Sequence, residues 1–245
     1  MKKILVVGSS GYVGNYMMKT LARRYPQVAV VGMSRSAQPR EEETARLPNV
    51  SYVKGDALEP ESFKQYLQDV DGVVHCVGTL IEKKNNPKLT YNAMNRDTVI
   101  NVAAELQEIA EAKGENRTFV LISSEKAPPF LDAYLTSKLE AEDYLFKECP
   151  NLKSTAIRPG FIWDPSHRWW SIPLHYGVDI AWWMNENIAR QLPFSSYYDF
   201  LFPAKSIRLS TLAHFVDQGV TGSLGDTKVV RNEALIQYEA ENPQK

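Results

Sequence analysis

Short apolar runs alternate with longer amphipathic stretches through about the first 160 residues of the chain. The apolar runs predict strands at Lys3–Val7, Val28–Met33, Val50–Lys54, Gly72–Val77, Thr118–Ser123 and Lys153–Arg158. The amphipathic stretches predict helices at Val13–Arg24, Pro60–Gln68, Tyr91–Lys113 and Asp132–Lys147. Strands and helices that alternate in this way predict an α/β fold, with a doubly wound parallel sheet covered by helices on both faces.

A glycine-rich turn links the first predicted strand to the first predicted helix. Its sequence is Gly8-Ser9-Ser10-Gly11-Tyr12-Val13-Gly14. Glycines at this spacing suit a sharp turn, close approach of the main chain to a pyrophosphate, and tight packing of helix on strand. The N–H groups at the start of the helix can then hold phosphates. We therefore expect Gly8, Ser10, Gly11, Tyr12, Val13 and Gly14 to bind a dinucleotide. A tight turn without a ligand is the alternative.

The end of the second predicted strand indicates which dinucleotide is bound. NAD sites usually carry an acidic residue there, whereas this chain has Ser34 and Arg35. An arginine can pair with a 2'-phosphate, so NADP(H) is favoured and NAD(H) is the second choice. Arg40 could assist. The alternative is that Arg35 is a solvated loop charge.

Two later segments fit the same site because they also follow predicted strands. Asp56 and Ala57 come after the third strand, next to Gly55, and Val77 and Gly78 come after the fourth. We expect all four of these residues to contact the cofactor. Asp56 could equally cap the turn that leads to the Pro60 helix.

Tyr134 and Lys138 form a Y-x-x-x-K pair on one face of a predicted helix. A lysine ammonium beside a phenol favours the phenolate, so we expect a lowered tyrosine pKa and proton transfer by Tyr134. Lys138 would also bind the nicotinamide ribose. Ser124, with Ser123 as second choice, ends the fifth strand and could orient a substrate carbonyl, or it could simply bond its own main chain. Asn95 could support a water relay to Lys138, or serve only in packing.

The character of the sequence changes after Gly160, which divides the chain into a dinucleotide-binding region, 1–160, and an aromatic-rich C-terminal region, 161–245. All five tryptophans fall between Trp163 and Trp183, and prolines 165, 173, 193 and 203 argue against a long helix there. This region should form a small elaboration on the substrate side. It could be a plain aromatic core, an apolar cleft for a prenylated ring, or an aromatic belt at a membrane surface. His167, Arg168 and His175 could meet a polar head group, but no catalytic role is assigned to them.

Composition excludes several classes of function. A net charge of −1 gives no reason to expect nucleic-acid binding. Cys76 and Cys149 form no metal-binding pattern, so we expect reduced thiols and no metal. No secretory signal or transit peptide is visible. No run approaches the ~20 apolar residues that span a bilayer, which leaves surface attachment open.

On the basis of these residues, the chain resembles the atypical short-chain dehydrogenase/reductases. Within that family it is similar to fungal proteins associated with coenzyme Q synthesis and, more distantly, to the nucleotide-binding accessory subunit of respiratory complex I. The resemblance rests on the segments Val73-Val74-His75-Cys76-Val77-Gly78-Thr79-Leu80, Tyr91-Asn92-Ala93-Met94-Asn95, Tyr134-Leu135-Thr136-Ser137-Lys138 and Arg158-Pro159-Gly160-Phe161.

The resemblance implies a Rossmann fold, in which Pro159 and Lys138 are further cofactor contacts. It also implies a protein on the matrix side of the mitochondrial inner membrane, although a cytoplasmic or bacterial origin fits the same sequence. Three functions follow as expectations. The first is an NADP(H)-dependent oxidoreductase acting on a carbonyl or on a quinone-like, prenylated substrate. The second is a non-catalytic, NADP(H)-stabilised accessory or assembly subunit of a membrane-associated complex. The third is an epimerase or isomerase.

Overall fold

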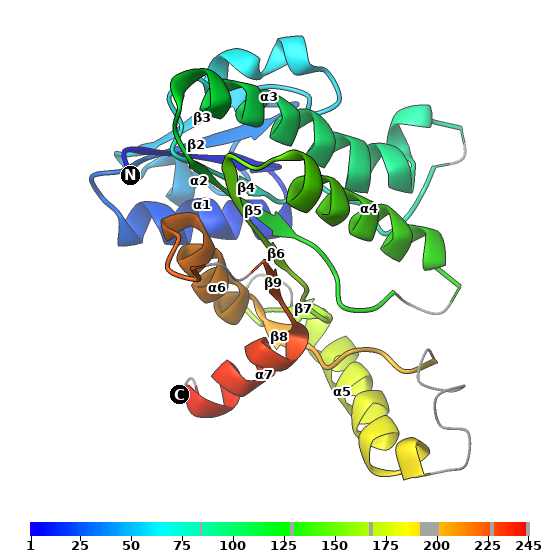
Figure 1. Ribbon diagram of the computed structural model, residues 1–245. Helices are drawn as coiled ribbons and strands as arrows, with labels where there is room; N and C mark the ends of the chain where they lie inside the picture. Colours follow the sequence, from blue (N-terminus) through cyan, green and yellow to red (C-terminus); the bar gives the residue numbers. More distant parts are fainter. Residues whose placement is uncertain (84, 128–129, 167–168, 192–200, 226–227, 244–245) are drawn as a thin grey trace.

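The computed structural model describes the chain apart from residues 84, 128–129, 167–168, 192–200, 226–227 and 244–245. Its main strands are β1 (Lys3–Val7), β2 (Ala29–Ser34), β3 (Val50–Lys54), β4 (Gly72–His75), β5 (Arg117–Ile122), β6 (Leu152–Ile157) and β9 (Val229–Val230). They form one seven-stranded sheet in the order β3-β2-β1-β4-β5-β6-β9 (Figure 1). Every neighbouring pair is parallel. The chain first builds outward from β1 to β3 and then crosses to the other side, which is a doubly wound topology.

Two pairs of helices cover the two faces of this sheet. α1 (Tyr12–Arg24) and α6 (Leu209–Thr221) pack on one face, and α3 (Thr98–Lys113) and α4 (Asp132–Glu148) pack on the other. Shorter helices and turns are α2 (Glu42–Ala45), η1 (Pro60–Ser62), η2 (Lys64–Leu67), η3 (Pro87–Leu89), η4 (Asn92–Asp97), η5 (Ala189–Gln191) and α7 (Asn232–Glu241). The sheet is therefore the middle layer of three.

The apolar runs of the sequence are explained by burial on both faces of the sheet. In β1, Ile4 and Val6 belong to the core beneath α1 and α6, while Leu5 and Val7 belong to the core beneath α3 and α4. All four side chains are buried. A strand covered on both faces needs apolar residues at successive positions, and such runs are readily seen in a sequence. The predicted α/β doubly wound class is confirmed.

The six predicted strands are present, and their ends differ from the prediction by at most two residues. The helix predicted over Pro60–Gln68 is wrong, because the chain there forms the two 3-10 turns η1 and η2. Phe63 between them leaves the helical region, with φ −134°, and buries its side chain completely. The long helix predicted from Tyr91 is present, but its first part, η4, is a π-helical turn.

The C-terminal region adds a projecting helix. α5 (Ser171–Asn187) stands away from the sheet (Figure 1), next to the two-stranded parallel pair of β7 (Ile162–Trp163) and β8 (Ile207–Arg208). The prediction that prolines exclude a long helix is wrong for Pro173. It is the third residue of α5, where the main-chain N–H has no partner within the helix, so proline costs little. Pro193 lies outside the described residues.

The division predicted at residue 160 does not match the layers of the structure. β9 extends the main sheet beside β6, and α6 covers the same face as α1. Leu212 and Val216 of α6 are completely buried against the strands. The sheet needs this cover, so α6 and β9 belong to the Rossmann layers although they follow residue 160. Among the helices that the structure describes, none is long and apolar enough to cross a membrane.

Candidate functional site

The glycine turn between β1 and α1 has the close packing that its spacing predicts. Gly8 has a φ of +85°, in the left-handed region that favours glycine, and a Cβ there would lie 3.1 Å from the main-chain nitrogen of Val77. A Cβ on Gly14 would overlap with the main-chain oxygen of Gly8. Gly11 precedes α1 and donates its N–H to Gly8. The turn can therefore bring main-chain N–H groups against a ligand, at a place where a side chain would not fit.

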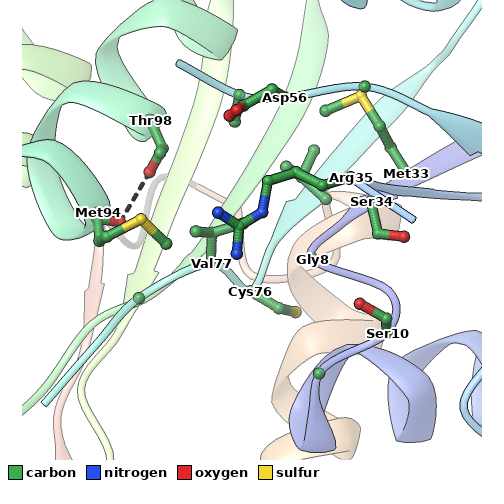
Figure 2. Close-up of a pocket in the computed structure, with 15 residues that line it drawn as sticks. Gly8, Ser10, Met33, Ser34, Arg35, Asp56, Cys76, Val77, Met94 and Thr98 are labelled. Atoms are coloured by element: carbon green, nitrogen blue, oxygen red, sulfur yellow. Dashed lines mark hydrogen bonds between the residues drawn. The ribbon is translucent and has the colours of Figure 1, made fainter. Parts of the chain in front are cut away.

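A pocket of about 190 Å³ opens above this turn (Figure 2). Nine of the predicted cofactor residues line it: Gly8, Ser10, Gly11, Ser34, Arg35, Asp56, Ala57, Val77 and Gly78. Tyr12, Val13, Gly14, Lys138 and Pro159 do not line it. Tyr12, Val13 and Gly14 belong to the first turn of α1, while Pro159 is buried after β6. The pocket thus gathers the residues expected around the pyrophosphate and adenosine, and it does not extend to the predicted catalytic residues.

Gly55, the neighbour of Asp56 in the predicted segment, lines the pocket as well, and five further lining residues were not predicted: Val7, Met33, Cys76, Met94 and Thr98. Val7 is the last residue of β1, Met33 is the last but one of β2, and Cys76 follows β4 directly. All three positions could have been inferred from the rule that ligands bind at the carboxyl ends of the strands. Met94 and Thr98 come from η4 and α3, and only the folded chain places this helix start over the pocket. Burial raises the pKa of the Cys76 thiol to about 12, so this thiol is not a nucleophile here.

Arg35 extends its side chain across the pocket toward Val77 and Met94, as Figure 2 shows. It is exposed and has no acidic partner among the described residues. Ser34 lies beside it, with Oγ accepting a hydrogen bond from the N–H of Ala37. A guanidinium group is therefore available at the place where the sequence predicted contact with a 2'-phosphate.

Asp56 borders the pocket and also makes a local turn. It lines the pocket, and its Oδ1 accepts a hydrogen bond from the N–H of Leu58 at 3.1 Å, which forms a turn of the capping type. Its Oδ2 lies 4.0 Å from Lys88 Nζ, and that lysine also pairs with Glu59 at 2.5 Å. The carboxylate therefore borders the pocket while it shapes the loop after β3.

Lys138 is buried at the carboxyl end of β5. Its Nζ donates a hydrogen bond to the main-chain oxygen of Ile122 at 2.9 Å, and it would lie 3.0 Å from a Cβ on Gly78. Burial lowers the pKa of this lysine to about 8. Lys138 therefore lies beside a loop that lines the pocket, although it is not part of the pocket wall itself.

Tyr134 differs from the prediction in its acidity. Burial raises the pKa of its phenol, and a hydrogen bond with Ser124 lowers it only in part. The expected lowering by Lys138 is wrong for this structure, because desolvation of the phenolate is the largest effect and the lysine is directed to Ile122. The Tyr134 ring packs edge-on against Tyr91, with 5.9 Å between centroids. The structure thus holds a neutral phenol next to Ser124.

The two candidate serines have different surroundings. Ser124 interacts with Tyr134 and donates its Oγ hydrogen to the main-chain oxygen of Lys126 at 2.9 Å. The hydroxyl of Ser123 instead donates to the buried carboxylate of Glu142. Ser124, the first choice, is therefore the serine that lies with the tyrosine, and it also makes the main-chain bond that was its structural alternative.

Asn95 lies in the π-helical turn η4 and is completely buried. Its Oδ1 accepts the N–H of Thr79 at 2.7 Å, and its Nδ2 donates to the oxygen of Thr79 and to Ser137 Oγ. This amide therefore holds the loop after β4 against α4. π-Helical turns are frequent at functional sites, and this one places the amide next to Gly78.

The tryptophan-rich segment does not form an aromatic core. Trp169, Trp170 and Trp183 are 77%, 49% and 53% exposed, so the plain-core alternative is wrong for these three residues. His175 has a structural role: its ring stacks on Trp163 with 3.9 Å between centroids, and its Nδ1 bonds Ser206. His167 and Arg168 lie outside the described residues.

The arrangement of these residues fits a dinucleotide. The turn has room only because Gly8 and Gly14 lack side chains, and Arg35 supplies a positive charge at one end of the pocket. Ser124, Tyr134 and Lys138 lie at or beside the carboxyl end of β5, the edge to which the glycine turn also belongs. The pyrophosphate and adenosine would occupy the pocket, and the reacting end would extend toward these three residues.

Comparison with known proteins agrees with this geometry. The model of a family described as NAD(P)H-binding matches residues 8–170. MIOREX complex component 2 of Saccharomyces cerevisiae is 26% identical over 206 residues, covering 68% of this chain and 74% of that protein. Isoflavone reductase homolog A622 of Nicotiana tabacum is 31% identical over 80 residues, covering 31% of this chain and 26% of its own length.

Solved structures show the same fold at low sequence identity. A short-chain type dehydrogenase/reductase from Mycobacterium ulcerans has a TM-score of 0.69 at 15% identity, covering 98% of this chain and 94% of its own. An NAD+-bound xylitol dehydrogenase has a TM-score of 0.64 at 14% identity, with 94% and 96% covered. At these sequence identities the comparison shows a similar fold and nothing about activity.

Proposed function

The chain belongs to the NAD(P)H-binding family, and from that premise we propose that it is an NADP(H)-dependent oxidoreductase acting on a carbonyl or quinone-like substrate. One observation carries the proposal. The hydroxyls of Tyr134 and Ser124 interact at the end of β5, at the same edge of the sheet as the glycine turn. A proton donor and an orienting hydroxyl thus stand together where the reacting end of a dinucleotide would lie.

Arg35 supports the choice of NADP(H). Its guanidinium reaches into the pocket without an acidic partner among the described residues, and Ser34 beside it can donate a hydrogen bond. A 2'-phosphate would give this arginine a charge-assisted partner, whereas a free ribose hydroxyl would not. NAD(H) would bind in the same pocket with this interaction missing.

Each catalytic side chain has a separate task in the proposed reaction. The bound dinucleotide supplies or accepts a hydride. Tyr134 donates the proton that a reduced carbonyl oxygen needs. Ser124 would orient that oxygen by turning its hydroxyl hydrogen to it from the main-chain oxygen of Lys126. Lys138 binds the nicotinamide ribose. Burial keeps Tyr134 protonated before the reaction, and the hydrogen bond with Ser124 favours the phenolate that proton donation leaves behind.

The substrate side supports an apolar substrate. Ile81 and Phe130 are 76% and 91% exposed on the loops that follow β4 and β5. Trp169 and Trp170 are exposed at the start of α5. These side chains would suit a quinone-like ring with a prenyl tail. A place beside the mitochondrial inner membrane belongs to the same proposal and rests on the resemblance to coenzyme Q and respiratory proteins.

The test is to purify the protein, identify any dinucleotide released on denaturation, and follow NADPH oxidation with a panel of carbonyls, quinones and quinone precursors. Tyr134→Phe should abolish turnover and leave NADPH affinity nearly unchanged. Tyr144→Phe is the matched control, because Tyr144 lies on the same helix, packs against the core beneath α3 and α4, and does not line the pocket. Unchanged turnover in Tyr134→Phe would remove the assigned proton donor.

A second candidate is a non-catalytic subunit that NADP(H) stabilises. The similarity to MIOREX complex component 2, a protein named for its complex, favours it. A ligand that binds only the folded state raises its stability by mass action. This candidate expects a higher Tm with NADPH, slow exchange of the bound nucleotide, and no NADPH consumption with any substrate of the panel.

A further inference from the structure

A buried ionic network lies directly beneath the catalytic residues. The carboxylate of Glu142 is only 3% exposed, and it accepts three hydrogen bonds from the guanidinium of Arg158. The distances are 3.0 Å from Nε to Oε1, 3.1 Å from Nε to Oε2 and 2.6 Å from Nη2 to Oε2. Ser123 Oγ donates a fourth bond to Oε1. The buried charge of Glu142 is thus fully partnered, as a stable buried charge must be.

The three partners come from three different elements. Glu142 is on α4, Arg158 follows the end of β6, and Ser123 follows the end of β5. Ser123 also donates its main-chain N–H to Ile157 of β6 at 2.8 Å. One carboxylate therefore joins α4 to the carboxyl ends of two neighbouring strands.

The position of Glu142 along α4 relates it to the catalytic side chains. Tyr134, Lys138 and Glu142 are spaced four residues apart, so they lie on one face of the helix. Two of them bond consecutive residues of the β5 end: Lys138 bonds the oxygen of Ile122, and Glu142 bonds the hydroxyl of Ser123. The next residue, Ser124, is the partner of Tyr134. A shift of α4 relative to β5 would change all three contacts together.

We propose that Glu142 is a positioning residue, whose bonds to Ser123 and Arg158 hold Tyr134 and Lys138 in register with Ser124. The proposal rests on the function proposed above, because it gives these three residues a common task. Glu142 itself is assigned no contact with substrate or cofactor. It acts through the placement of α4 on the ends of β5 and β6, and through its negative charge one helical turn from Lys138.

The pKa of Lys138 reports on this placement, because it depends on the groups that face the lysine. Burial lowers the lysine pKa, whereas the Cys76 thiol from the β4 end and the Glu142 carboxylate raise it. His75 of β4 is also close enough for Lys138 to lower the histidine pKa. Of these groups, Glu142 is the carboxylate, and burial keeps His75 neutral above about pH 3. Removing the carboxylate leaves the positive charge of Arg158 without compensation and should lower the lysine pKa further.

The experiment titrates Lys138 in the full chain without added nucleotide. NMR of 13Cε-labelled lysine over a pH series, with the Lys138 signal assigned by its absence from Lys138→Met, gives the midpoint of this buried side chain. In Glu142→Gln the midpoint should move to lower pH by about one unit, and in Glu142→Asp, which keeps the charge, it should stay closer to the parent value. The matched control is Asp143→Asn, which removes an exposed carboxylate paired with Lys147 on the same helix and should leave the midpoint unchanged.

NADPH binding and turnover separate this proposal from the proposed function. Glu142 does not line the pocket, so NADPH affinity in Glu142→Gln should remain within about twofold of the parent chain. If the parent chain oxidises NADPH, kcat in this variant should fall by about tenfold or more, with an unchanged KM for NADPH. If the parent chain shows no turnover, the proposed function fails, and the Lys138 titration still tests the positioning role. An unmoved Lys138 midpoint in Glu142→Gln overturns the positioning role.

A double variant covers the case in which Glu142→Gln does not fold. Glu142→Met with Arg158→Met removes both buried charges, and such apolar replacements are commonly tolerated. Hydrogen exchange should then be at least about tenfold faster in the first two turns of α4, residues 132–138, and unchanged in α3. Equal protection of α4 in the parent chain and in the double variant would contradict the proposal.

Discussion

The ammonium group of Lys138 donates a hydrogen bond to the main-chain oxygen of Ile122 at 2.9 Å, at the carboxyl end of β5. This bond connects α4 to the strand that leads to Ser124. It also buries a positive charge, which explains why the lysine pKa falls to about 8. The same contact therefore places the lysine and makes its protonation costly.

The burial of Lys138 should make stability depend on pH. The folded state releases this proton near pH 8 and the unfolded state near 10.5, so the unfolded state binds more protons between these values. The free energy of unfolding should therefore rise with pH in this window, by up to about 3 kcal/mol. Lys138→Met should lack this rise. Urea unfolding of both chains from pH 7 to 10.5, without nucleotide, measures it, and parallel curves would contradict the burial of a charged lysine.

His75 should make the chain sensitive to acid. Burial lowers the pKa of His75 to about 3, so below about pH 6.5 the unfolded state takes up a proton that the folded state does not. Stability present above pH 6.5 is then lost as the pH falls toward 3. His75→Phe, which keeps a ring next to Phe119, should flatten this part of the acid unfolding curve. A curve as steep as that of the parent chain would mean that His75 is already charged in the folded state.

Arg35→Ser tests the preference for NADP(H). Losing a charge-assisted bond to a 2'-phosphate should weaken NADPH binding by about 10- to 100-fold. NADH affinity should change little, because its ribose hydroxyl does not need the guanidinium. Titration calorimetry with both nucleotides gives the ratio of the NADPH and NADH affinities in each chain. Arg46→Ser is the control, since this exposed arginine pairs with Glu42 away from the pocket. Equal losses for NADPH and NADH would show that Arg35 does not recognise the phosphate.

Gly14→Ala tests the close packing of the glycine turn. The added Cβ would overlap with the main-chain oxygen of Gly8, which cannot move without opening the turn. We expect a loss of stability of about 2 kcal/mol or more and loss of nucleotide binding. Gly177→Ala is the matched control, because a Cβ there meets nothing within 4 Å and lies within α5. It should leave binding unchanged and stabilise the helix by about 0.5–1 kcal/mol. Thermal unfolding and NADPH titration compare the two.

The parts of the fold that could be predicted from sequence are those dictated by short-range physics. The residues of β1 are apolar at successive positions because both faces of the strand are covered, and this pattern is visible in the chain itself. Gly8 and Gly14 have a local geometric reason that does not depend on distant residues. The pocket residues that follow β1, β2, β3 and β4 were found because strand ends meet at one edge of the sheet.

Other features depended on tertiary contacts and could not be seen in the same way. β9 has only two residues, which is too short for any periodicity. Pro173 indicated a break, yet it occupies a helix position that tolerates proline. The raised pKa of Tyr134 follows from burial, which spacing along a helix does not reveal. The hydrogen bonds of Glu142 with Ser123 and Arg158 are likewise set by how α4 packs on the sheet.

The late position of α6 and β9 in the chain has a consequence for synthesis. β1 and α1 leave the ribosome before α6 and β9, and the apolar face that they share is completed only by Leu212 and Val216, some 200 residues later. Until then this face has to be shielded by chaperones or by transient contacts. The nascent chain can therefore form its glycine turn long before it can bury β1, the strand that supports the turn. A chain that is interrupted near residue 200 should bind chaperones and should not be released as a smaller functional protein.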